Sequence, residues 1–197
     1  MTFTMEILKE AVKKNDVSTL NQCLQSGNFT DENLECALIL GAMYGNENIV
    51  DALLSFGVDV NCMNSGDSAI HQASLMNHLN VLEVLLTYKV DVDAINSDYR
   101  TGLHYASKEG YTHIVRRLLN AGADYSIKDD DGLTPPMLAQ LYEKEDIVAL
   151  FRQVGVSQFE YYDSDTESDD DLAPITPYST PAEILIRAKR MKNSLKN

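Results

Sequence analysis

A period of 33 residues is the feature of the sequence that most constrains its fold. Three six-residue segments align at this spacing: they begin at Ser68, Thr101 and Thr134 and read SAIHQA, TGLHYA and TPPMLA. A second pattern repeats in the same register, a short turn followed by an aliphatic run and a closing loop, and its clearest copy is residues 110–124. A fixed period of this length predicts stacked copies of one small unit.

Each unit is expected to be two short antiparallel helices that cannot bury their apolar face alone. The aliphatic residues recur at the i, i+1, i+4, i+5 spacing of one helix stripe: Ile49, Val50, Leu53 and Leu54, then Val81, Leu82, Leu85 and Leu86. Burial of each such side chain is worth about 1.5 to 3 kcal/mol. The stripe can be buried only against a neighbouring unit, so the sequence predicts an all-α solenoid.

The period and the T-P-L-H-x-A pattern resemble the ankyrin repeat family over residues 5 to about 156. The likeness is weaker where residues 35–40 replace the motif and where Met137 replaces its histidine. It implies an array over residues 1–157 with units starting near residues 5, 34, 66, 99 and 132, the outer two acting as caps. It also implies that His71 and His104 tie neighbouring turns together by hydrogen bonds, whereas His78, at a turn, is expected to be solvated.

The composition changes after Gly155. Residues 158–180 are predicted to be a disordered acidic linker, because the stretch EYYDSDTESDDD is too charged to fold. Residues 181–197 are predicted to form a short basic amphipathic helix that docks on the array, binds a partner or serves as an import signal. Acidic or proline contexts mark phosphorylation candidates, with an unmodified linker as the alternative: Ser164, Thr166, Ser168, Thr176 and Thr180.

Charge and cysteine content narrow the classes of partner and site. A net charge of −14 opposes binding to phosphate backbones and anionic lipids, so neither nucleic acid nor a membrane is an expected partner. Cys23, Cys36 and Cys62 lack the spacing of a zinc site and are expected to be reduced thiols. We therefore expect no metal, no cofactor and a monomer in the cytoplasm, the nucleus or both.

The resemblance implies that a partner protein binds the concave face, made of turn tips and the ends of the first helices. The residues before each inter-helix turn are Met43, Tyr44, Leu75, Met76, Lys108, Glu109, Leu141 and Tyr142, and the turn tips add Asp67, Tyr99, Arg100, Asp131 and Leu133. Three of the four pairs are apolar or aromatic, which predicts recognition of a helix or extended peptide with apolar and basic residues. The alternative is that some of them pack between adjoining units.

Two binding functions fit this layout. The first is an adaptor or scaffold that holds a client protein, tuned by phosphorylation of the tail. The second is an inhibitor that masks a transcription factor or kinase; the chain is similar in layout to ankyrin inhibitors of NF-κB-type factors, although it lacks their Ser-rich N-terminal degradation signal. The sequence contains no P-loop, GxSxG, HExxH or dinucleotide motif, so no enzymatic activity is expected.

Overall fold

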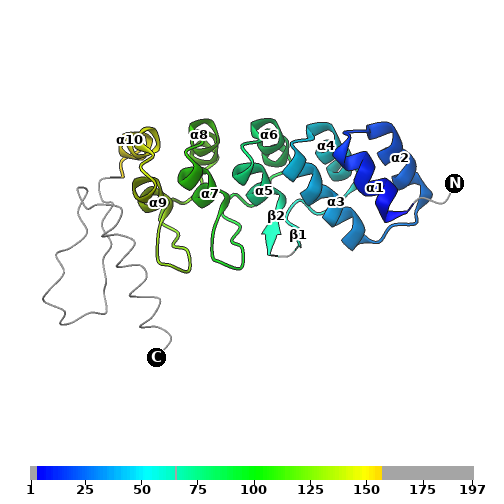
Figure 1. The fold of residues 1–197 in the computed structure, drawn as a ribbon, viewed down its shortest axis with the longest axis horizontal. Helices are drawn as coiled ribbons and strands as arrows, with labels where there is room; N and C mark the ends of the chain where they lie inside the picture. Colours follow the sequence, from blue (N-terminus) through cyan, green and yellow to red (C-terminus); the bar gives the residue numbers. More distant parts are fainter. Residues whose placement is uncertain (1–3, 65, 157–197) are drawn as a thin grey trace, which may run out of the picture.

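The computed structural model describes residues 4–64 and 66–156, and its helices form five antiparallel pairs stacked in a row (Figure 1). The first helices of the pairs are α1 (Met5–Lys13), α3 (Asp31–Tyr44), α5 (Ala69–Leu75), α7 (Gly102–Glu109) and α9 (Pro135–Leu141). The second helices are α2 (Val17–Ser26), α4 (Glu47–Phe56), α6 (Leu79–Thr87), α8 (Thr112–Asn120) and α10 (Glu145–Gln153). The expected all-α solenoid is confirmed. The predictions for residues 158–180 and 181–197, with all five phosphorylation candidates, lie outside the described residues.

The core runs along the whole row between a layer of first helices and a layer of second helices (Figure 1). The fully buried side chains come from both layers, and the largest include Leu38, Ile70 and Leu103 from the first layer and Ile49, Leu53, Leu82, Leu85 and Ile114 from the second. Each first helix packs on its own second helix and on the first helices beside it. The aliphatic stripe seen in the sequence is therefore the seam that joins one unit to the next.

The turn inside each unit places one residue in the left-handed region, and these residues are Asn15, Gly45, Asn77, Gly110 and Glu143. The next residue reaches back to the preceding unit: Asn46 Nδ2 donates to the Val12 carbonyl at 2.5 Å, and His78 Nε2 lies 3.1 Å from the Met43 carbonyl. A Cβ at Gly45 would lie 2.6 Å from His78 Nδ1, so this turn needs glycine. The expectation that His78 is solvated was wrong, because its ring is half-buried in this contact.

Long loops, which we call fingers, follow α4, α6 and α8 and project below the first helices in Figure 1. They span residues 57–68, 88–101 and 121–134. The first finger contains a short antiparallel pair, β1 (Met63–Asn64) with β2 (Asp67–Ser68), that the sequence did not predict. This finger is two residues shorter than the next, and Gly66, at φ 94°, helps it close into a hairpin.

No finger precedes the first helix of the second unit, α3. Only residues 27–30 connect α2 to α3, and α3 begins at Asp31, before the predicted start near residue 34. Thr30 and Asn33 form a capping box that starts the helix there. As a result α3 has 14 residues, whereas α5 has 7.

Free thiols occur at all three cysteines. Cys23 and Cys62 are buried, and burial raises the pKa of Cys62 to about 12, so this thiol is neutral at physiological pH. Such a thiol packs as a small apolar group. Within the described part of the chain, none of the helices combines the length and the hydropathy that a membrane span requires.

Replacement of a core residue should lower the stability of the array. For Leu103→Ala we expect the free energy of unfolding to fall by about 2 to 5 kcal/mol, because Leu103 is fully buried and its loss leaves a cavity. Urea unfolding followed by far-ultraviolet circular dichroism measures the change. Ile95→Ala, at an exposed position, is the control and should change stability by less than about 0.5 kcal/mol. Equal losses in the two variants would contradict the assigned packing.

Candidate binding surface

One side chain from each unit forms a row at the C-terminal ends of the first helices, directly before the left-handed turn residue. We call this set the turn row, and it consists of Lys14, Tyr44, Met76, Glu109 and Tyr142. Tyr44, Met76 and Tyr142 are 42%, 43% and 46% exposed, although they are large apolar or aromatic side chains. The sequence analysis did not include Lys14, because the first unit fits the repeat loosely. Its position directly before the Asn15–Asp16 turn is the sequence feature that could have identified it.

From the second unit on, the residues one position earlier are partly buried. Met43, Leu75 and Leu141 lie between the surface and the neighbouring helices, so these three contribute to packing as well as to the surface. Lys108 is different, because its Nζ lies 5.2 Å from the centroid of the Tyr142 ring. This cation–π contact joins the fourth unit to the fifth. The row is therefore apolar or aromatic at the second, third and fifth units and charged at the first and fourth.

The second and third fingers are each held by a histidine from the preceding unit. His104 Nδ1 accepts the backbone N–H of Thr101 at 3.0 Å, and its Nε2 lies 3.2 Å from the Leu133 carbonyl in the next finger. His71 makes the same two contacts, and its Nε2 lies 2.9 Å from the Arg100 carbonyl. The linking role implied by the family resemblance is therefore present at both histidines.

This bonding pattern requires neutral imidazoles. Because Nδ1 accepts a backbone N–H, the proton of each ring must sit on Nε2, where it is donated to the finger carbonyl. Burial lowers the pKa of His104 to about 4 and also lowers the pKa of His71. The fifth unit has Met137 at the equivalent position, buried in apolar surroundings, and the described chain offers no further finger for a histidine there to hold.

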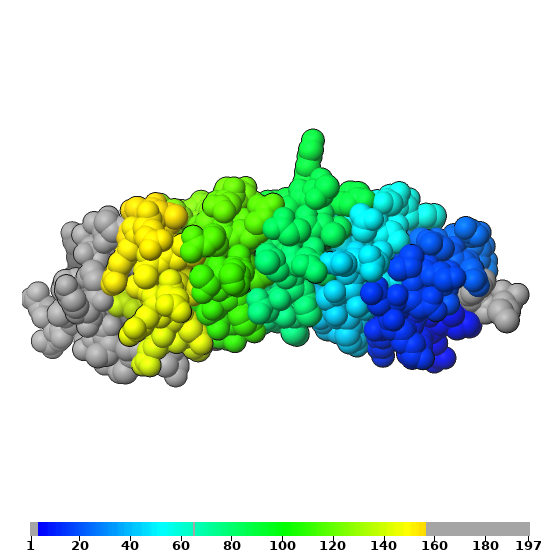
Figure 2. Space-filling view, turned by 90° about the horizontal axis from the view of Figure 1, so that it is seen from above, coloured from blue at the N-terminus to red at the C-terminus, as the bar shows by residue number. Residues whose placement is uncertain are grey.

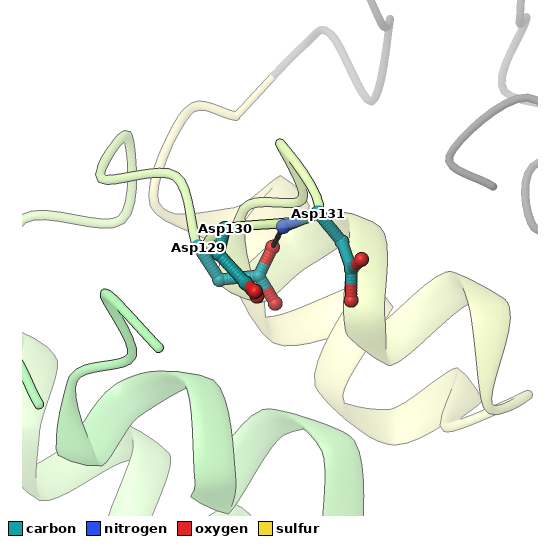
Figure 3. Close-up of side chains that lie close together, drawn as sticks. All are labelled: Asp129, Asp130 and Asp131. Atoms are coloured by element: carbon teal, nitrogen blue, oxygen red, sulfur yellow. Dashed lines mark hydrogen bonds between the residues drawn. The ribbon is translucent and has the colours of Figure 1, made fainter. Parts of the chain in front are cut away.

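An ion pair ties the second finger to the third. Arg100 Nε lies 3.1 Å from Asp129 Oδ2, and its Nη2 lies 3.5 Å from Asp131 Oδ2. Asp129 also accepts the backbone N–H groups of Asp131 and Leu133 at 3.0 and 2.9 Å. Burial raises the pKa of Asp129. Figure 3 shows this carboxylate close to those of Asp130 and Asp131. The Arg100 guanidinium supplies a positive charge beside Asp129 and Asp131.

Tyr99 stands at the tip of the second finger in a conformation that an aromatic residue rarely adopts. Its φ is +56°, and the equivalent residue of the third finger is Gly132 at +75°. The side chain is 59% exposed. A bulky residue held in the left-handed region costs of the order of 1 kcal/mol or more, and such strain is found most often at functional positions.

The other turn-tip residues of the predicted surface are partly engaged in contacts within the array. Asp67 accepts hydrogen bonds from Gln72 and from Asn96 Nδ2, at 3.0 and 2.9 Å, and Arg100 is engaged in its ion pair. The expectation that Leu133 lies exposed at a turn tip was wrong: the side chain is 3% exposed, because its backbone closes the finger against Asp129 and the side chain turns into the core. The fingers lead into the N-terminal ends of the first helices, and these ends lie about 12 Å from the turn row along an eight-residue helix.

Comparison with known families bears on what this surface does. A family model of ankyrin repeats in three copies matches residues 8–96 and 88–160. The chain belongs to the ankyrin repeat family. The members of this family bind other proteins and are typically not enzymes, so this ankyrin array is a protein-interaction module.

Three relatives share parts of the array. The inactive serine/threonine-protein kinase TEX14 of Mus musculus is 36% identical over 110 residues, which is 55% of this chain and 8% of the relative. The putative ankyrin repeat protein L271 of Acanthamoeba polyphaga mimivirus is 42% identical over 55 residues, or 28% of this chain and 8% of the relative. Protein phosphatase 1 regulatory subunit 12A of Mus musculus is 35% identical over 75 residues, or 33% and 7%. The match thus spans less than a tenth of each relative.

Acid should weaken the fold through His104. Its pKa is about 4 in the folded ankyrin array and about 6.5 in the unfolded chain, so between these values the unfolded chain binds the proton and the folded chain does not. The free energy of unfolding should therefore fall as the pH drops, by about 2 kcal/mol from pH 7 to pH 5 for this histidine alone. Urea unfolding at the two pH values measures the loss.

His104→Gln is the matched variant, since it removes the titrating ring and keeps an amide donor. Two other groups also contribute to the pH dependence of stability. His71 contributes with the same sign as His104, and Asp129 with the opposite sign because its pKa is raised. Both contributions are present in the wild type and in the variant. The variant should lose about 2 kcal/mol of the pH dependence. The same pH dependence in both proteins would show that His104 is not the group responsible.

Proposed function

We propose that this ankyrin array is an adaptor or scaffold that holds a client protein on its concave face, with the turn row and the finger tips as the contact surface. The observation that carries the proposal is the alignment of Tyr44, Met76 and Tyr142, which are each more than two-fifths exposed at equivalent positions of their units. Tyrosine and methionine supply large, adaptable contact area, and a monomer gains no stability by exposing them.

The order of side chains in the row describes the client. Successive first helices lie about 8 to 10 Å apart, a step that corresponds to about five to seven residues of helix or about three of an extended strand. Tyr44 and Met76 favour apolar residues at two successive steps, Glu109 favours a basic residue at the next, and Tyr142 favours an apolar or cationic residue at the last. A client helix or extended segment with this pattern fits the row.

The names of two relatives support a regulatory binding role over catalysis. Protein phosphatase 1 regulatory subunit 12A is by name a regulatory subunit, and TEX14 is by name an inactive kinase. The matched segments are a small part of both proteins, so we do not propose that protein phosphatase 1 is a client of this chain. What supports the adaptor role is that a relative which shares part of this array is by name the regulatory subunit of an enzyme.

A triple variant tests the turn row. Tyr44→Ala, Met76→Ala and Tyr142→Ala together should abolish capture of the client in affinity purification with mass spectrometry, because they remove the exposed apolar contacts and leave the seam intact. The control is Ile7→Ala with Val154→Ala, which removes exposed apolar side chains outside the row. Circular dichroism must show that both variants keep the helical content of the wild type.

Two outcomes would count against the proposal. If the triple variant retains every partner that the wild type captures, the turn row is not the binding surface. If a captured client loses its own activity when the array is added at one-to-one stoichiometry, the protein is an inhibitor that masks the client and not an adaptor.

A further inference from the structure

A hollow of about 310 Å³ lies beside the second unit, at the opposite end of α3 from the turn row. The first two turns of α3 line one side with Asp31, Leu34 and Glu35, and residues 56–59 at the end of α4 line the other. The hollow exists because the second unit lacks a finger. In the later units a finger precedes the first helix, whereas here the four residues 27–30 lead directly into α3 (Figure 1).

The hollow is lined by apolar and acidic side chains. Leu34 is buried, whereas Phe56, the last residue of α4, is 54% exposed. Asp31, Glu35 and Asp59 supply three carboxylates, and none of the lining residues is basic. An aliphatic stem that ends in a cation matches this combination, because the stem covers apolar surface, and the charge meets the carboxylates and the face of an aromatic ring.

We propose that the hollow binds the basic C-terminal segment of the same chain, residues 184–196. This segment contains five basic residues and no acidic residue, and it also carries apolar side chains: its sequence is ILIRAKRMKNSLK. Elsewhere the chain is strongly acidic, since the net charge of the whole protein is −14 even with these five positive charges included. The segment is therefore complementary to the hollow in both charge and hydrophobicity.

The chain leaves the array on the same edge as the hollow. Val58, at the hollow, follows a left-handed residue and donates its N–H to the carbonyl five residues earlier, that of Leu53. Val156, the last residue described, follows the left-handed Gly155 and donates in the same way to Phe151. Val58 and Val156 are thus equivalent positions three units apart, so the segment need not pass across another face to reach the hollow.

The length of the intervening chain is sufficient. Three unit steps of about 8 to 10 Å put the hollow about 30 Å from the point where the chain leaves the array. Residues 157–183 provide 27 residues, which can span at most about 90 Å when extended. A random coil of 27 residues has a root-mean-square end-to-end distance of about 30 Å, and the effective concentration of a tethered ligand is highest when this distance matches the span.

Nuclear magnetic resonance of the full-length protein tests this docking. The amide spectrum of the ¹⁵N-labelled wild type is compared with that of one quadruple variant, which combines Arg187→Gln, Lys189→Gln, Arg190→Gln and Lys192→Gln. We expect the largest shift changes outside the substituted segment at residues 31–35 and 56–59, and we expect them to be independent of protein concentration. In the reverse experiment, Glu35→Gln with Asp59→Asn should shift the amides of residues 184–196.

The matched control is Glu145→Gln with Asp146→Asn, which changes the charge equally at the exposed start of α10 and should leave the amides of residues 184–196 in place. Three results would overturn the proposal: no shift changes in the array, shift changes centred on Tyr44, Met76 and Tyr142, or shift changes that grow with protein concentration. The second would place the segment on the turn row, and the third would indicate docking between two copies. Because the hollow and the turn row lie at opposite ends of α3, neither proposal depends on the other.

Discussion

Burial of one aliphatic stripe per helix pair against the next pair is the constraint on which the rest of this structure depends. A pair such as α5 and α6 is too small to enclose Ile70, Leu82 and Leu85 by itself, and these side chains are fully buried only because neighbouring pairs stand on both sides. Stacking therefore sets the separation of the units and the direction of every helix. It also repeats every surface position at regular intervals, so that a single side chain per unit becomes a row.

Polar contacts then settle what apolar packing leaves open. Contacts between aliphatic surfaces are non-directional and do not fix the conformation of a loop. His71 and His104 each fix a finger, because Nδ1 accepts one hydrogen bond and Nε2 donates another. The Arg100–Asp129 ion pair adds a second link between neighbouring fingers. Removal of one partner from such a buried network leaves the other unsatisfied, so the network makes a single arrangement of the fingers much more stable than its alternatives.

The departures from strict repetition are informative because stacking does not require them. A missing finger exposes the flank of α3, and the strained Tyr99 replaces the glycine that the third finger has at Gly132. Tyr44, Met76 and Tyr142 expose apolar area that the seam does not use. Local features that oppose stability without serving the fold are where binding is expected.

The sequence by itself determined the helix pairs and the seam, because a 33-residue period and a helical stripe depend only on local spacing. The linking roles of His71 and His104 followed from the resemblance to the ankyrin family. It also placed Tyr44, Met76 and Tyr142 at helix ends, although their use by a client is still a prediction. Only the tertiary structure decided which positions remain exposed: Leu133 turns into the core, His78 contacts the preceding unit, and Phe56 faces a hollow. Each of these outcomes depends on how a neighbouring unit is placed, which no single repeat encodes.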